Sequence, residues 1–313
     1  MVSAALLATI AVGCLAAAAR LRWASWPARG PYIAVITWQV LGLTWGISTI
    51  GALLAFGLVP YEKGVIGGLA ALASDASAHG LYLSRLAETP LGAVRVAAVI
   101  AAFGLTLVLF CGLVASSVHV LRTRRRHHDL LELVSRDDPE VPGARVLDHP
   151  AAAAYCLPGV LRSKIVISAG ALEVLARSEL SAVLAHEHAH LRQRHDLVLL
   201  PFSSLKRAFP RVRMVETYYR AVALLIEMCA DDQAGRERSP KELATALLRF
   251  GTAGNAQVPA GAMAAGDAEP EVVRRVSRLI APAEELSRPA AAAVLLSAFT
   301  LMATTLSLWH LPM

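Results

Sequence analysis

Charged residues are scarce in this sequence. Asp, Glu, Lys and Arg make up 17% of the 313 residues, whereas 56% are hydrophobic, and the mean hydropathy is +0.52. An ordinary soluble domain carries about 25% charged residues, so this composition argues against a chain that is soluble over its whole length. We therefore expect part of the chain to lie in a membrane.

Cysteines and nucleic-acid-binding signatures are also lacking. The four cysteines are scattered, so neither a disulfide framework nor a cysteine metal site is expected. The formal net charge of +6 is concentrated in arginines beside apolar runs, which suits anionic lipid headgroups better than nucleic acid. The sequence therefore predicts a lipid bilayer as a partner and no direct nucleic-acid partner.

Four apolar runs are long enough to be membrane helices, at residues 3–19, 32–59, 91–120 and 289–308. The first run has no basic segment before it and no convincing cleavage site, so we interpret it as a retained span, with a signal peptide as the alternative. Residues 60–90 form a modest polar segment that does not resemble a ligand-binding domain.

A basic cluster at residues 122–128 follows the third run and sets the expected topology. The positive-inside rule places this cluster and the loop at 20–29 in the cytoplasm, with both termini outside. We expect three domains: a three-span region at 1–120, a cytoplasmic domain at 121–287, and a fourth span with a short external end at 288–313.

One stretch of the cytoplasmic domain carries the pattern H-E-x-x-H. Residues 178–196 read as a single helix with Ser178 as its N-cap, and His186, Glu187 and His190 lie on or beside its apolar stripe. Ionisable groups on such a face are costly unless they are paired or bound. Because residues four apart share one helix face, two imidazoles can hold a zinc ion while Glu187 reaches its bound water. A histidine pair on a surface helix is the alternative.

Zinc with two histidine ligands needs a third ligand, and Glu227 and Asp231 follow on a helix predicted at 216–235. Both carboxylates would lie on one face, so that Glu227 binds the metal and Asp231 accepts the second ring N–H of a ligating histidine. Carboxylates four apart are common on helices, but the upstream H-E-x-x-H favours a site. We expect one Zn²⁺ per chain.

The two motifs together resemble those of the membrane gluzincins. The arrangement is similar to the peptidase part of the BlaR/MecR antirepressor receptors, with the HtpX and Ste24 membrane peptidases as relatives. The resemblance implies that His186, His190 and Glu227 bind zinc, that Glu187 is the general base, and that Asp231 supports a ligand. We expect a mainly α-helical protein with a small β-sheet and four membrane spans, in which a cytoplasmic gluzincin domain is inserted between the third and fourth spans.

Short strands are predicted at 145–147, 152–155 and 164–168, before the metal helix, and helices at 240–250 and 271–280 after it, separated by a loop at 251–270. A peptide substrate would add a strand to the edge of the sheet. The proposed edge consists of Ala152, Ala153, Ala154, Tyr155 and Cys156. An ordinary core strand is an equally good interpretation of it.

An oxyanion donor is also needed, and the sequence does not choose among its candidates, which are His195, Tyr218, Tyr219 and Arg220. His195 lies about half a turn out of phase with His186 on a continuous helix, so a solvated helix end is the favoured interpretation. His188 is out of phase too and is not expected to bind metal.

The sequence departs from the BlaR/MecR receptors in one respect: it shows no external penicillin-binding domain after the fourth span. Ser203 and Lys206 fit S-x-x-K, but no S-D-N or K-T-G partner accompanies them, so we interpret the match as coincidence. Direct covalent sensing of a β-lactam is therefore not expected, and a homodimer or a separate sensor partner stays open.

These observations favour a zinc endopeptidase of the bacterial cytoplasmic membrane that cleaves a cytoplasmic protein. By resemblance, the substrate would be a winged-helix repressor similar to BlaI and MecI, cleaved in a signalling pathway. The first alternative is a quality-control protease similar to HtpX. The second is a non-catalytic membrane receptor or scaffold in which zinc is structural.

Overall fold

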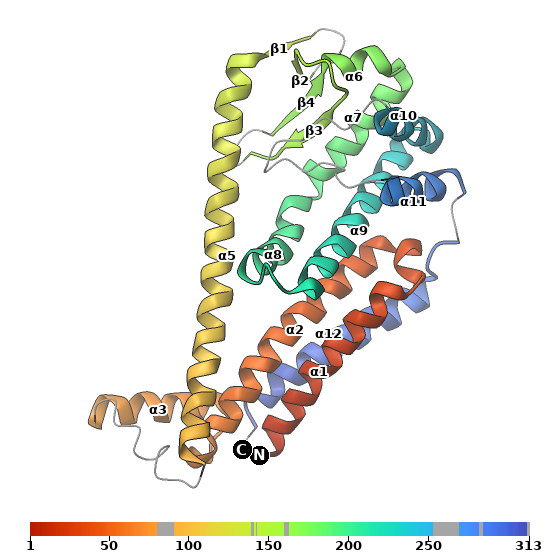
Figure 1. The fold of residues 1–313 in the computed structure, drawn as a ribbon. Helices are drawn as coiled ribbons and strands as arrows, with labels where there is room; N and C mark the ends of the chain where they lie inside the picture. The colour runs from red at the N-terminus through yellow and green to blue at the C-terminus, as the bar shows by residue number, and fades with distance from the viewer. Residues whose placement is uncertain are drawn as a thin grey trace. The chain divides into compact units, whose positions relative to one another are not determined.

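The computed structural model describes residues 1–79, 91–138, 141, 143–159, 163–252, 269–281 and 284–311. The described chain is mainly helical with one four-stranded sheet, which confirms the expected fold class (Figure 1). It divides into two compact units, residues 1–111 with 286–313, and residues 112–285. One long helix, α5 (Gly92–Val134), runs from the first unit into the second.

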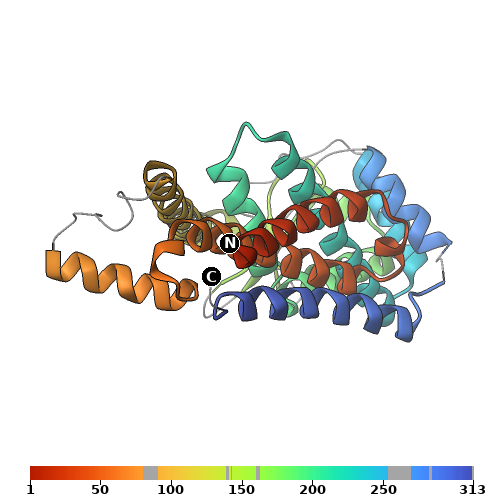
Figure 2. The same ribbon diagram turned by 90° about the horizontal axis from the view of Figure 1, so that it is seen from below.

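The first unit is built from long apolar helices. These are α1 (Val2–Trp23), α2 (Pro31–Gly57), the first part of α5, and α12 (Arg288–Leu308). All four helices are long and apolar enough to cross a membrane, so the four predicted spans are confirmed as candidate spans. In Figure 2, α2 runs beside α1, drawn in red, and α12, drawn in blue, and it packs against both.

The described residues of this unit also form three shorter elements: the 3-10 helices η1 (Trp26–Arg29) and η2 (Val59–Tyr61), and α3 (Val65–His79). The segment expected to be polar at 60–90 therefore contains a helix, and its residues 80–90 lie outside the described residues. A Cβ at Gly57 would lie 2.5 Å from Cγ2 of Val99, so glycine at this position lets α2 and α5 approach closely.

The sheet of the second unit has the order β1-β2-β4-β3. Its strands are β1 (Ser135–Asp137), β2 (Ala144–Leu147), β3 (Ala154–Leu157) and β4 (Lys164–Ser168). β2 and β4 are parallel, and the two outer pairings are antiparallel. Three strands lie close to their predicted positions. The short, polar β1 was not predicted, because it lacks the apolar alternation that marks a strand.

Six helices follow the sheet: α6 (Ala169–Val174), α7 (Arg177–Arg192), α8 (His195–Ala208), α9 (Arg213–Glu237), α10 (Pro240–Thr252) and α11 (Glu269–Ile280). The helices predicted at 216–235, 240–250 and 271–280 are present and slightly longer than expected. The predicted loop at 251–270 falls largely on residues 253–268, which lie outside the described residues.

The prediction of one helix over 178–196 is wrong at both ends. Its N-cap is Ala176 rather than Ser178, because a carboxylate oxygen of Glu179 accepts a hydrogen bond of 2.8 Å from the Ala176 backbone N–H. The helix ends at Arg192, and Arg194 takes a left-handed backbone conformation with φ of 50° before α8 begins. The spacing of apolar residues does not reveal a single left-handed residue, so this break could not be predicted from it.

Candidate active site

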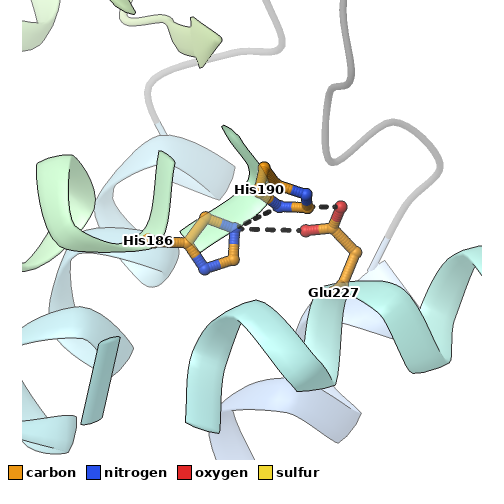
Figure 3. A group of neighbouring side chains, drawn as sticks. All are labelled: His186, His190 and Glu227. Carbon is orange, nitrogen blue, oxygen red and sulfur yellow. Dashed lines mark hydrogen bonds and ion pairs between the residues drawn. The ribbon is translucent and has the colours of Figure 1, made fainter. Parts of the chain in front are cut away.

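Three predicted ligands meet between α7 and α9. His186 and His190 lie one turn apart on α7, and α9 packs against α7 so that Glu227 faces both rings (Figure 3). The two histidine Nε2 atoms are 3.1 Å apart. The Glu227 carboxylate oxygens lie 3.4 Å from Nε2 of His186 and 3.5 Å from Nε2 of His190.

These separations suit a tetrahedral metal ion. Zinc bonds of 2.0–2.1 Å in tetrahedral geometry place ligand atoms about 3.3 Å apart, close to all three observed distances. Two imidazoles and one carboxylate are also a donor set that zinc uses with its fourth position open. The structure thus brings together the three residues that the sequence proposed as ligands, in an arrangement that fits zinc.

His186 is held by Asp231, one turn after Glu227 on α9. Nδ1 of His186 lies 3.0 Å from a carboxylate oxygen of Asp231, which leaves Nε2 facing the other ligands. Burial alone would lower the pKa of His186, but the contacts with Asp231 and Glu227 outweigh burial and raise it to about 9. The predicted pairing of Asp231 with a ligating histidine is therefore present in the structure.

The structure adds Arg275 of α11, which the sequence analysis did not identify. Its guanidinium donates two hydrogen bonds to Asp231, of 2.7 Å and 2.9 Å, and Nη1 lies 2.9 Å from a Glu227 oxygen. Arg275 is only 2% exposed. Burial opposes ionisation of Glu227 and Asp231, but Arg275 outweighs burial and holds the pKa of both carboxyls below the ordinary range.

The charges of these buried groups also suit a divalent cation. Glu187, Glu227 and Asp231 are three carboxylates, and Arg275 is the cation that contacts two of them. When the three carboxylates are ionised and His186 is neutral, as a metal ligand must be, two negative charges are left over, which is the charge that a divalent metal neutralises. Because burying uncompensated charge is costly, this balance supports metal binding independently of the ligand distances.

His190 is held by a second hydrogen-bonded chain. Its Nδ1 lies 3.0 Å from Nδ1 of His195, and Nε2 of His195 lies 2.8 Å from the side-chain oxygen of Gln193. With Nε2 of His190 facing the metal group, its Nδ1–H donates to His195, and His195 in turn donates to Gln193. Burial lowers the pKa of His195 to about 4, which keeps this ring neutral and able to accept.

The interpretation of His195 as a solvated helix end is therefore wrong. His195 is 4% exposed, and its ring packs edge-on against His190 with centroids 4.8 Å apart. On a continuous helix His195 would lie out of phase with His186, but the left-handed turn at Arg194 redirects the chain so that His195 returns to the site. Since its ring is committed to His190 and Gln193, His195 is a support for a ligand rather than an oxyanion donor.

Glu187 lies beside the metal group and is also buried, at 7% exposure. Among the described residues, one of its carboxylate oxygens has no hydrogen-bond partner. Burial raises the pKa of Glu187 to about 7, close to the value that suits a general base at neutral pH. A buried oxygen without a partner is what a metal-bound water would satisfy.

The other three proposed oxyanion donors lie on α9 before Glu227. Arg220 is exposed and pairs with Glu216 at 2.8 Å, and the ring of Tyr219 lies under the Lys206 ammonium group at 4.6 Å. Tyr218 precedes them on α9, more than two turns before Glu227. His188 is exposed and lies outside the metal group, as its helical phase predicted.

The proposed substrate strand is only partly accessible. β3 lies at the edge of the sheet among the described strands, with β4 as its neighbour. Ala153 and Ala154 are half-buried, whereas Ala152, Tyr155 and Cys156 are buried. Exposed surface is therefore limited to the start of the segment, where the backbone of Ala153 already exchanges hydrogen bonds with Ser168. The S-x-x-K pair serves local structure, since Ser203 donates to the Leu200 carbonyl and Lys206 pairs with Glu216.

A comparison with protein-family models gives one match, to peptidase family M48, over residues 119–230. The matched segment contains the sheet, the H-E-x-x-H helix and Glu227, and it ends just before Asp231. The search against curated proteins returned no match. Residues 119–230 of this chain, which carries four candidate membrane spans, are thus similar to peptidase family M48 and contain all three residues of the metal-binding group.

Proposed function

We propose that this chain is a zinc endopeptidase of the bacterial cytoplasmic membrane that hydrolyses peptide bonds of a cytoplasmic protein. The observation that carries the proposal is the group of buried His186, buried His190 and half-buried Glu227, with an unpartnered oxygen of Glu187 beside it. A non-catalytic, structural zinc site would normally be closed by four protein ligands, and the described residues supply three.

The protein's own groups divide the work of peptide hydrolysis among them. Zinc, when bound, lowers the pKa of a coordinated water and polarises a carbonyl group. Glu187 is placed to accept a proton from that water and to deliver it to the departing amine, which its raised pKa favours. Asp231 and His195 fix the rings of His186 and His190, so that both present Nε2 to the same point.

We further propose that the peptidase unit faces the cytoplasm and that both termini face outside. The basic cluster after the third span supports this orientation. Reporter fusions after Arg126 and after the last residue test it. The first fusion should be active only with a cytoplasmic reporter and the second only with an external one. The reverse pattern would place the metal site outside the cell.

For the substrate, the resemblance to BlaR/MecR peptidases supports a winged-helix repressor. The test uses Glu187→Ala as a trap in the native cells, because this variant should bind a substrate without cleaving it. We expect covalent cross-linking to recover a small cytoplasmic repressor. The control is the double variant Glu187→Ala/His190→Ala, which lacks a metal ligand and should recover much less.

The identity of the trapped protein separates the remaining alternatives. Recovery of misfolded membrane proteins alone would reject the repressor and support a quality-control protease. If Glu187→Ala retained full signalling and recovered nothing beyond the control, the site would be structural and the chain a receptor or scaffold.

A further inference from the structure

The turn between α8 and α9 forms an exposed tip of mixed character. We define the α8–α9 tip as residues 207–214, which contain three arginines and no acidic residue. Arg207, Arg211 and Arg213 are exposed, and so are the apolar side chains of Val212 and Met214, each at 42%. Exposed hydrophobic groups alternating with arginines are typical of segments that lie in a membrane interface.

The positive charge of the tip is not neutralised by the described part of the protein. No ion pair joins Arg207, Arg211 or Arg213 to a described carboxylate. The closest acidic residue in the sequence, Glu216, is already engaged by Lys206 at 2.9 Å and by Arg220 at 2.8 Å. The tip therefore presents three cationic groups for an anionic partner.

Two contacts show where α8 runs relative to α5. Near the start of α8, Asp196 pairs with Arg124 of α5 at 2.8 Å. At its end, a Cβ at Gly112 of α5 would lie 3.5 Å from Cβ of Ala208. The same number of residues separates the two contacts on each helix. α8 thus runs antiparallel along α5, from the basic cluster back toward the apolar run (Figure 1).

This direction brings the tip to the level of a bilayer surface. The apolar run of α5 begins at Val96, directly after Arg95, and about 20 helical residues cross a hydrocarbon core, which places the far boundary near Ala115. Gly112 lies within about 5 Å of that boundary. The end of α8, which packs at Gly112, therefore lies where acyl chains give way to headgroups.

We propose that the α8–α9 tip is a lipid-docking surface that binds the headgroups of anionic phospholipids. Arg207, Arg211 and Arg213 contact the phosphates, while Val212 and Met214 enter the boundary of the acyl chains. α8 follows the metal helix and α9 carries Glu227. Docking the tip therefore fixes both ligand-bearing helices to the membrane surface, where a substrate must present its cleavage segment.

The first test places the photo-crosslinking residue p-benzoylphenylalanine at position 214 of the full chain. The protein is illuminated in nanodiscs of phosphatidylcholine with phosphatidylglycerol, and lipid adducts are measured by mass spectrometry. The matched control carries the same residue at position 133, where Leu133 is 82% exposed on α5, about 30 Å beyond Gly112. We expect at least about tenfold more lipid adducts at position 214. Equal yields at both positions would overturn the proposal.

The second test asks whether anionic headgroups are recognised. Arg211→Glu/Arg213→Glu should lower the adduct yield by at least about fivefold in the phosphatidylglycerol nanodiscs and much less in phosphatidylcholine alone. The control Arg236→Glu/Arg238→Glu changes the net charge equally at the other end of α9, where both arginines are exposed, and should change neither yield. Equal losses in both lipids, or with the control variant, would overturn headgroup recognition.

Discussion

Replacing Glu187 by Gln is expected to lower the rate of peptide hydrolysis about 10²- to 10⁴-fold, the range that one acid–base group contributes. The amide keeps the size of the side chain but cannot accept a proton at neutral pH. Glu187 is not among the three residues that form the metal group, so the zinc content should stay at one per chain. Hydrolysis of a fluorescently labelled unfolded protein and metal analysis on the same sample provide the two measurements.

His188→Gln is the matched control for this substitution. His188 is the next residue on α7, but it is exposed and does not belong to the metal group. Its replacement should leave both the hydrolysis rate and the zinc content close to the wild-type values. Full activity in Glu187→Gln would exclude Glu187 as the base. Loss of zinc in that variant would instead show that Glu187 supports metal binding.

Arg275→Met should destabilise the zinc-free protein by about 3–5 kcal/mol, as expected when one partner of a buried ion pair is removed. The loss arises because Glu227 and Asp231 would lose the buried guanidinium that contacts both of them and keep only the ring of His186 as a counter-charge. For a unit of this size, it corresponds to a fall in Tm of about 10 °C. Zinc supplies another counter-charge, so the fall should be smaller in zinc-loaded protein than in protein treated with a chelator.

Arg278→Met provides the comparison, because Arg278 joins the same two helices. It pairs with Asp232, at 2.5 Å and 2.9 Å, but that pair is more exposed and has no described contact with the metal ligands. The loss of stability in Arg278→Met should be smaller than that in Arg275→Met and independent of zinc. If the two variants lost equal stability, or if zinc changed neither loss, Arg275 would be an ordinary link between α11 and α9.

The sequence predicted the parts of this protein whose geometry is local. Residues four apart on a helix share a face whatever the rest of the fold does, which is why His186 and His190 could be paired from spacing alone. The four spans could be predicted from hydropathy, because the length and apolar character of a run are also local properties of the sequence. Glu227 lies on a different helix from the two histidines. Only the need of zinc for a third ligand connected it to the H-E-x-x-H motif.

Arg275 was missed although its sequence carries a signal. On α11 it stands on one apolar stripe with Val272, Val276 and Leu279, which pack into the core. A charged residue inside such a stripe is the same kind of anomaly that identified Glu187 on the metal helix. The stripe does not indicate which residue pairs with Arg275, since Asp231 lies 44 positions away.

The left-handed residue at Arg194 has a consequence for how this kind of site is found in sequences. Each residue added to or removed from the turn would rotate the start of α8 by about 100° and carry the His195 ring away from His190. The number of residues between His190 and His195 is therefore as strictly constrained as the spacing inside H-E-x-x-H. For this architecture the informative search pattern is the longer H-E-x-x-H-x-x-x-x-H-D, whose last residue is the Asp196 that pairs with Arg124. A chain that matches only the first five letters must orient its second histidine by some other group.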